Sequence, residues 1–267
     1  RVWIDTDAGC GHRPDTDADD CIALLLLLRA ETIELAGIGT VHGNAPVDVA
    51  QRLVHELAAL IGAGRAPPIH RGSADENPTG PAPAHQALRE ALAAGPLTIV
   101  ALGPLTNIAA TLRGRPDLAR NVGRLVVVMG RRPGHLFHPS EGRGRGILFG
   151  HGPVFRDFNF DKDRAAASEI LALGLPVTLI PYEAARHVTL SGADLAALDG
   201  AGGAPAWVSR RARGWLEYWN GVVGIGGFYP FDAVAAAYAL EPALFDCAEA
   251  AAWVAKDRKL GGRLLGP

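Results

Sequence analysis

Five aspartates end or open apolar segments of this sequence, and together they have the chemistry of a metal site. Asp5 and Asp7 end the first apolar segment, Asp19 and Asp20 open the second, and Asp232 opens an alanine-rich segment near the end. Crowded carboxylates repel and raise one another's pKa unless a cation or a proton holds them. Asp7, Asp20 and Asp232 therefore indicate a hard divalent cation. All-oxygen ligation favours calcium or magnesium over zinc.

Helix capping is the plainer explanation of these acids. Asp19, Asp20 and Asp232 stand where N-caps and first-turn acids are common. Capping does not explain Asp5 and Asp7, because no helix begins at the strand end where they stand. The acidic stretch 15–26 lacks the glycine and glutamate of an EF-hand loop, which excludes that motif. The Asp5-Thr6-Asp7 element is weakly similar to the motif of aspartate-nucleophile phosphatases and leaves a metal-dependent phosphatase as a minor alternative.

These polar residues lie between alternating strand-like and helix-like segments. Short aliphatic runs predict buried strands, and apolar residues spaced by threes and fours predict helices. The alternation predicts an α/β fold, a mostly parallel open sheet with helices on both faces and a Rossmann-like core. Ligands bind beyond the carboxyl ends of such strands, where we expect the polar residues to meet in one crevice. The predicted strands are 2–5, 33–41, 97–102, 125–129 and 177–180, and the predicted helices are 19–30, 47–63, 105–113 and 163–173.

Two stretches rich in proline, glycine or small residues, 67–83 and 131–153, are predicted to be loops. The second is long enough to be a binding loop or lid, or else it is disordered. Its arginines indicate either a phosphate-binding function or only the usual basic residue of a chain with few lysines. They are Arg131, Arg132, Arg143 and Arg145.

The composition limits the partners and the location. The 267 residues are 48% apolar and 20% charged, which suits a single domain over 1–267. A net charge of −2 provides no basic field for a nucleic acid polymer or an anionic membrane, and the longest aliphatic run, 22–28, is too short to span a bilayer. Three scattered cysteines, Cys10, Cys21 and Cys247, predict neither a disulfide framework nor a zinc site. With no targeting segment visible, we expect a reducing compartment and a cytoplasmic protein.

Five motifs occur in the order in which they occur in the nucleoside hydrolase family, and the sequence resembles that family over most of its length. Family members cleave the N-glycosidic bond of inosine, uridine and related nucleosides. The two halves of the family's N-terminal D-x-D-P-G-x-D-D-A element are similar to D-T-D-A-G (5–9) and D-D-C (19–21). The other motifs are matched by T-V-H-G-N (40–44), G-P-L-T-N-I-A (103–109), in part by M-G (129–130) with D-F-N (157–159), and by F-D-A-V-A-A-A-Y (231–238).

The resemblance implies a calcium-dependent hydrolase of a ribonucleoside or related riboside. It implies one Ca²⁺ bound by Asp7, Asp20, Asp232 and the backbone carbonyl of Leu102, with the ribose 2′ and 3′ hydroxyls and the attacking water on the same ion. Asp7 is then the general base, and Asn159 joins it as a catalytic residue. The implied substrate is a small-molecule riboside, and family members are commonly dimers or tetramers. The residues implied to line the ribose are Asp19, Asn44, Met129, Asp157 and Asn159, with Asp157 at a position where the family usually has Glu.

Three departures from the family pattern affect the expected site. The first is an insertion of about eight residues between Gly9 and Asp19, which we expect to bulge outward; the alternative is that it displaces Asp7 from Asp20. The second is Phe231, where many members have a histidine that protonates or orients the departing base. The third is the shortened region 67–85, whose histidines His70 and His85 are expected to lie on the surface.

These departures predict altered recognition of the base. Trp215, Tyr218 and Trp219 are spaced as on one helix face, which is typical of a packed core face or of rings that stack on a base. A non-catalytic ribose or nucleoside binder with the same fold is the alternative to a hydrolase.

Overall fold

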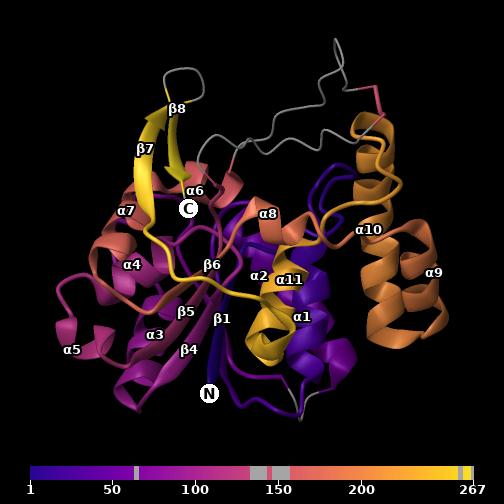
Figure 1. The fold of residues 1–267 in the computed structure, drawn as a ribbon. Helices are drawn as coiled ribbons and strands as arrows, with labels where there is room; N and C mark the ends of the chain where they lie inside the picture. The colour runs from indigo at the N-terminus through magenta and orange to yellow at the C-terminus, as the bar shows by residue number, and fades with distance from the viewer. Residues whose placement is uncertain (63–65, 133–142, 146–156, 258–260, 266–267) are drawn as a thin grey trace.

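The structure is a computed structural model, and it describes residues 1–62, 66–132, 143–145, 157–257 and 261–265. Six parallel strands form one open sheet in the order β3-β2-β1-β4-β5-β6 (Figure 1). The predicted parallel α/β fold is therefore confirmed. The strands are β1 Val2–Thr6, β2 Leu35–Thr40, β3 Ile69–Arg71, β4 Leu97–Ala101, β5 Val122–Val128 and β6 Val177–Ile180.

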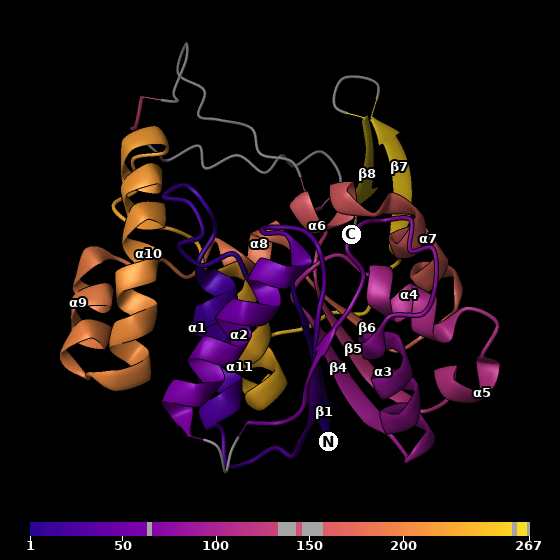
Figure 2. The ribbon, with the colours of Figure 1, turned by 180° about the vertical axis from the view of Figure 1, so that it is seen from behind.

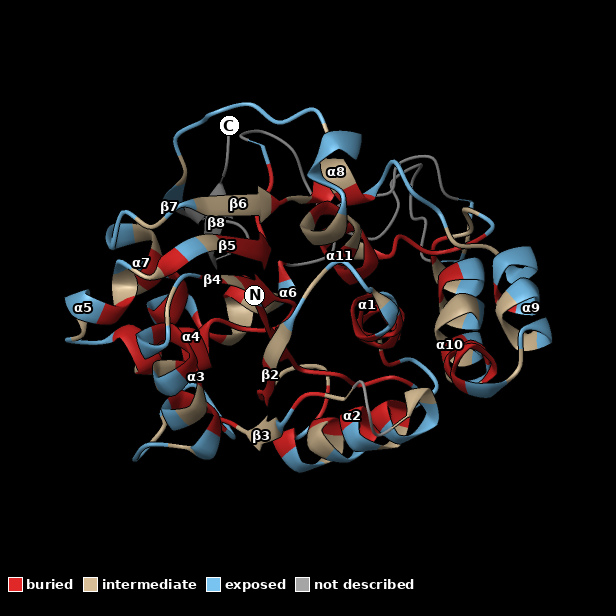
Figure 3. Cartoon of the chain, turned by 90° about the horizontal axis from the view of Figure 1, so that it is seen from below, coloured by how far each residue is buried: buried red, intermediate tan, exposed pale blue. Residues whose placement is uncertain are grey.

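Helices cover both faces of this sheet (Figure 3). One face carries α1, α2 and α11, and the other carries α3, α4 and α7. The helices α9 and α10 pack together beside α1 and α2, at the side away from α3 to α5 (Figure 2). The bounds are α1 Asp19–Arg29, α2 Val47–Ile61, α3 Pro83–Ala93, α4 Thr106–Leu112, α5 Pro116–Ala119, α6 Phe158–Lys162, α7 Arg164–Ala172, α8 Tyr182–Ala185, α9 Gly192–Gly200, α10 Gly203–Val222 and α11 Phe231–Leu240.

Alternation along the strands builds the two apolar cores. Ile4, Val100 and Val126 belong to the cluster under α1 and α11, whereas their neighbours belong to the cluster under α3, α4 and α7. Successive side chains of a strand point to opposite faces, so each apolar strand supplies both clusters. The neighbours in question are Trp3, Ile99, Ala101, Leu125 and Val127.

The predicted loop 67–83 contains a short strand that was not predicted. β3 pairs with the edge of β2 over three residues, and α3 begins at Pro83. An antiparallel hairpin of β7 Trp253–Asp257 and β8 Gly261–Leu265 follows the last helical turn, Pro242–Leu244. No helix in the described part of the chain has the length and apolar character needed to cross a bilayer.

The strand order places the predicted polar residues at one point. β1 and β4 are neighbours in the sheet. After β1 the chain continues to β2 on one side, and after β4 it continues to β5 on the other side. A crevice forms at the carboxyl ends of strands where the order of connection reverses. The loops after β1, β2, β4 and β5 therefore meet there.

Candidate active site

A pocket of about 420 Å³ opens at the carboxyl ends of the central strands. Seven predicted site residues line it, and they come from the loops after the strands and from the first turns of helices. Asp7 and Asp20 lie beneath, fully buried. The seven are Asp19, Asn44, Leu102, Met129, Asp157, Asn159 and Asp232.

Three buried carboxylates converge under this pocket. Asp19, Asp20 and Asp232 each offer an oxygen, and these oxygens lie within 4.8 Å of one another. Two of the three open α1 and the third stands in the first turn of α11, where the helix N-termini favour negative charge. The helices are also fixed to each other, because the backbone N–H of Asp232 donates to Oδ2 of Asp19 at 2.9 Å.

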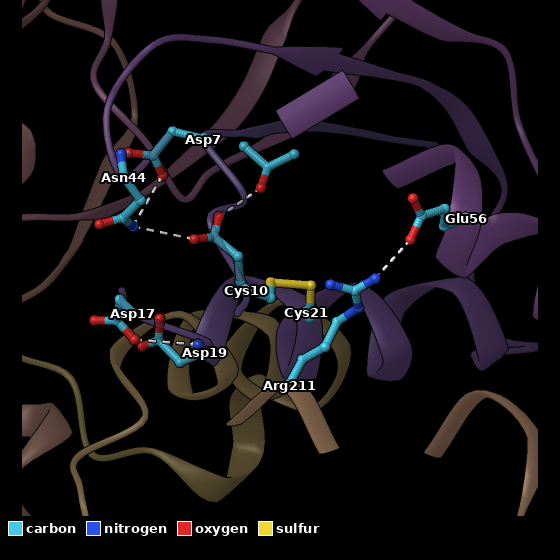
Figure 4. Close-up of a disulfide and its surroundings, with 10 residues drawn as sticks. Asp7, Cys10, Asp17, Asp19, Cys21, Asn44, Glu56 and Arg211 are labelled. Carbon is cyan, nitrogen blue, oxygen red and sulfur yellow. Dashed lines mark hydrogen bonds and ion pairs between the residues drawn. A yellow bond between two sulfur atoms is a disulfide. The ribbon is translucent and has the colours of Figure 1, made fainter. Parts of the chain in front are cut away.

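Asn44 connects Asp7 to this cluster (Figure 4). Its backbone N–H donates to Oδ2 of Asp7 at 2.7 Å, and its side-chain amide donates to Oδ2 of Asp20 at 3.2 Å. Thr6 donates its hydroxyl to the other oxygen of Asp20. The loop after β2 thus holds the two carboxylates that the insertion separates in sequence.

Glycines let the backbone approach Asp7 closely. A Cβ added at Gly43 would collide with the Asp7 carboxylate, and one added at Gly103 would lie 3.0 Å from its Cβ. Steric crowding therefore explains why the motifs after β2 and β4 have glycine at these two positions. They leave room for a carboxylate at the centre of the site.

Burial and mutual repulsion raise the pKa of the clustered carboxyl groups. Burial and the charge of Asp19 raise the pKa of Asp20 to about 7. Burial raises the pKa of Asp232 well above its ordinary value, as do the charges of Asp19, Asp20 and Asp7. Burial and Asp20 do the same to Asp7. Among the described residues no cationic side chain forms an ion pair with these groups, so the set fits a bound divalent cation.

Asn159 and Asp157 organise the other side of the site. The Asn159 amide donates to the carbonyl oxygens of Leu102, at 2.7 Å, and Val128, at 3.0 Å. The Asp157 carboxylate caps α6 by accepting from the N–H of Phe160, and it accepts from the N–H of Gly130 at 2.7 Å. Burial raises the pKa of Asp157 to about 6, although these two donors lower it.

The helical aromatic face of α10 faces the pocket. Trp215 and Tyr218 are stacked, with ring centroids 5.3 Å apart and planes 6° apart, and both line the cavity. Trp219 lines it too but is 3% exposed and belongs to the core. Phe231 stacks on Tyr182 at 6.4 Å, and both rings line the pocket. Both predicted roles of these rings are therefore observed: Trp219 packs in the core, and Trp215 and Tyr218 form part of the pocket surface.

The expectation that the insertion bulges outward holds only in part, because residues 11–15 are exposed but the loop also borders the pocket. Four of its side chains line the pocket, and its chain returns so closely that a Cβ at Gly9 would collide with the Thr16 methyl group. The Asn44 amide donates to both Asp7 and Asp20, so one residue bridges them, although Asp7 does not belong to the group of carboxylates whose oxygens lie within 4.8 Å of one another. The four lining residues are Arg13, Asp15, Thr16 and Asp17.

The cysteine prediction is also wrong. Cys10 and Cys21 form a disulfide with Cα atoms 6.2 Å apart, and Cys247 is exposed and unpaired (Figure 4). The count of three cysteines could not show this pairing, because the folding of the insertion brings the two together. Disulfides persist chiefly in oxidising compartments, so the inference of a reducing compartment loses its basis.

Neither histidine of the shortened region lies in the pocket. His85 is 1% exposed, not on the surface as expected, and its Nε2 contacts Ser73 Oγ at 2.9 Å and Asn107 Oδ1 at 3.1 Å. His70 is half-buried and stacks on Trp3. Their contacts are those of structural residues.

The arginines of the second predicted loop do not line the pocket where the structure describes them. Arg131 is buried, Arg132 donates its backbone N–H to Glu183, and the backbones of Arg143 and Arg145 bond to the end of α10. Residues 133–142 and 146–153 of that loop lie outside the described residues. The cationic residues among the described lining are Arg13 and Lys162.

Several residues that line the pocket were not predicted from the sequence. Asp17 accepts the backbone N–H of Asp19 at 3.1 Å, yet in the sequence it is only one acid of an unmatched insertion. Phe158 lay inside a recognised motif, whereas Lys162 and Tyr182 stood in no motif. A signal for Tyr182 was available, because it follows the predicted strand that ends at Ile180.

Known proteins similar in sequence to this chain are nucleoside hydrolases and an uncharacterized protein. A model of the family described as inosine-uridine preferring nucleoside hydrolase matches residues 2–264. The non-specific ribonucleoside hydrolase RihC of Klebsiella pneumoniae is 29% identical over 223 residues, which cover 74% of this chain and 66% of that protein. The uncharacterized protein C1683.06c of Schizosaccharomyces pombe is 26% identical over the same shares of the two chains. The chain thus spans about two thirds of the length of these relatives.

Solved structures share the fold. The plant nucleoside hydrolase PpNRh1 superposes with a TM-score of 0.80 at 22% identity, covering 100% of this chain and 86% of that one. A purine-preferring ribonucleoside hydrolase from Gardnerella vaginalis superposes with a TM-score of 0.77 at 19% identity, covering 100% and 88%.

Proposed function

Because the chain belongs to the inosine-uridine preferring nucleoside hydrolase family, we propose that it hydrolyses the N-glycosidic bond of a ribonucleoside or related riboside, releasing base and ribose. One observation carries the proposal beyond family membership. Buried carboxylates that lack a cationic partner among the described residues converge under a pocket lined by aromatic rings. This combination suits a sugar held over a metal ion and an aromatic leaving group stacked on rings.

The proposed cofactor is Ca²⁺, bound by Asp7, Asp20, Asp232 and the carbonyl oxygen of Leu102. Asp19 also contributes an oxygen to the convergent group, so it is a further candidate ligand besides its proposed contact with ribose. When bound, the ion would orient the ribose hydroxyls and lower the pKa of a water molecule.

The chain's own residues supply the remaining chemistry. Asp7 is proposed to take the proton of the attacking water, while the Asn44 N–H fixes the orientation of its carboxylate. Asp19, Asn44, Met129, Asp157 and Asn159 are proposed to surround the ribose. The transition state of glycoside hydrolysis is oxocarbenium-like, so the surrounding carboxylates favour its developing positive charge.

Phe231 supports altered recognition of the base. No histidine is among the described residues that line the pocket, and Phe231 cannot donate a proton to a leaving group. The rings of Trp215 and Tyr218 offer stacking instead. We therefore propose that the preferred aglycone stacks well and leaves with little protonation.

The domain organisation, the oligomeric state, the partners and the location of the protein remain predictions. A single domain over 1–267, a homo-oligomer such as a dimer or tetramer, and the absence of nucleic acid and membrane partners remain expectations. A cytoplasmic location also stays a prediction, and the Cys10–Cys21 disulfide counts against it. A phosphorylated riboside loses support, because the arginines that suggested it do not line the described part of the pocket.

The test is release of ribose or ribose phosphate from a panel of purine and pyrimidine nucleosides and their 5′-monophosphates. We expect release in calcium, loss of release with a chelator, and loss in Asp7→Ala. The matched control is Asp246→Ala, which removes an exposed aspartate and should leave the rates unchanged. A panel that binds without any release would replace the hydrolase by the ribose-binding protein.

A further inference from the structure

The insertion that separates Asp7 from Asp20 is closed at its base by the Cys10–Cys21 disulfide (Figure 4). Cys10 follows Asp7 by three residues, and Cys21 is the residue after Asp20. We propose that this disulfide positions the metal site, by holding the two carboxylate-bearing segments together across the insertion. The proposal rests on the proposed function only in assigning Asp7 and Asp20 to one metal ion.

Chain length alone would not keep these segments close. The two cysteines are 11 positions apart in the sequence, and a flexible chain of that length has a typical end-to-end distance of about 18 Å. In the structure their Cα atoms are 6.2 Å apart. Hydrogen bonds within the insertion join near neighbours, such as His12 N–H to Gly9 and Thr16 N–H to Arg13. These local bonds shape the loop but do not connect its first residue to α1.

The disulfide is built into the core and not attached to the surface. Cys10 is completely buried and Cys21 is 1% exposed, and both belong to the apolar cluster under α1. Cys21 stands in the first turn of α1, the turn that carries Asp19 and Asp20. A covalent bond at this position acts on the orientation of that turn relative to the loop after β1.

The insertion also packs against a second helix, α10. A Cβ at Gly11 would lie 3.1 Å from the Arg211 side chain, and one at Gly214 would collide with the carbonyl oxygen of Pro14. Arg211 in turn forms an ion pair of 2.7 Å with Glu56 of α2 (Figure 4). The insertion is therefore packed against α10 in addition to being tied to α1 by the disulfide.

The experiment measures calcium binding by titration calorimetry on the full chain, with turnover recorded separately. In Cys10→Ala/Cys21→Ala we expect the affinity for Ca²⁺ to fall roughly 10-fold to 100-fold, the usual effect of losing groups that orient metal ligands. Cys247→Ala removes the exposed, unpaired cysteine and should bind Ca²⁺ like the unmodified protein. Binding is read below the unfolding temperature of each variant, so a loss of stability alone would not change it.

A second variant tests whether the disulfide is needed because the insertion is long. Replacing residues 10–18 by two glycines in a Cys21→Ala background shortens the connection, and we expect this change to restore Ca²⁺ affinity without the bond. Unchanged affinity in Cys10→Ala/Cys21→Ala, with only the unfolding temperature lowered, would overturn the proposal and leave a structural cross-link. Absence of Ca²⁺ binding by the unmodified protein would overturn it too, whereas Ca²⁺ binding without turnover would overturn only the hydrolase. Chemically reduced unmodified protein keeps the insertion but lacks the bond, so its Ca²⁺ affinity should match that of the double variant, and an affinity equal to that of the oxidised protein would overturn the proposal.

Discussion

The side-chain amide of Asn159 donates a hydrogen bond of 2.7 Å to the backbone carbonyl oxygen of Leu102. The same amide group also holds the carbonyl of Val128, so one side chain fixes the ends of β4 and β5. Leu102 is a proposed calcium ligand through that carbonyl. Asn159 therefore orients the proposed ligand oxygen and also lines the pocket.

Removing this amide is expected to weaken the metal site. In Asn159→Ala the Leu102 carbonyl loses the donor that orients it, and we expect Ca²⁺ affinity to fall about 10-fold to 100-fold. Calcium titration gives the affinity directly. Asn77→Ala removes an exposed asparagine and serves as the control. Equal affinities in the two variants would show that the carbonyl needs no such support.

Asp157 is expected to impose an acidic limb on the pH profile. Its pKa is raised to about 6 by burial, and both of its oxygens accept backbone N–H groups, an arrangement that suits the ionised form. At saturating calcium, kcat/KM should rise with pH through about 6 and then level off. Asp157→Asn should lower the plateau and lose this limb, whereas Asp157→Glu should keep a limb. A limb that persists in Asp157→Asn would assign it to another group.

Asp5 is expected to make the metal-free protein less stable as pH rises. Burial raises the pKa of Asp5 from 3.8 to about 7, while a hydrogen bond from Asn107 lowers it. The folded protein then binds more protons than the unfolded chain between these values. The contribution to the free energy of unfolding is therefore fully present below about pH 4 and is lost as pH rises through 7.

Urea unfolding at several pH values, in the presence of a chelator, measures this dependence. Asp5→Asn should flatten the curve between pH 4 and 7, and Asp246→Asn, an exposed control, should leave it unchanged. Parallel curves for Asp5→Asn and the unmodified protein would show that Asp5 titrates at its ordinary pKa.

Phe231→His is expected to add leaving-group assistance. The ring lines the pocket, and the residue precedes Asp232 at the start of α11. A histidine there would supply a proton to a departing base, and we expect roughly a 10-fold higher kcat on purine nucleosides, below the full effect of an evolved general acid. A riboside with a nitrophenol leaving group needs no proton and should be unaffected. Equal gains on both substrates would indicate a change in packing instead.

The sequence predicts the sheet well because its central strands are continuous aliphatic runs. The stretches 125–128 of β5 and 99–101 of β4 are buried on both faces, which is the pattern that a short apolar run indicates. The strand β3 escapes prediction because it is three residues long and follows two prolines. Its existence depends on pairing with β2, which is a tertiary contact.

The positions of the site aspartates are more predictable than the residues of the pocket wall. Asp7, Asp19, Asp20 and Asp232 stand at strand ends or helix starts, and the parallel topology brings such positions together. The direction of the insertion and the Cys10–Cys21 bond depend instead on how the loop packs against α10. Helical spacing cannot distinguish a core face from a pocket face for Trp215 and Tyr218, because both faces are apolar.

The stacked pair Trp215 and Tyr218 gives the protein an optical property. The emission of an indole ring depends on the polarity and stacking of its surroundings, and the indole of Trp215 lines the pocket beside that of Trp219. A base that enters the pocket would displace water from these rings. Occupancy of the pocket is therefore reported by intrinsic tryptophan fluorescence, with no label and no need for turnover.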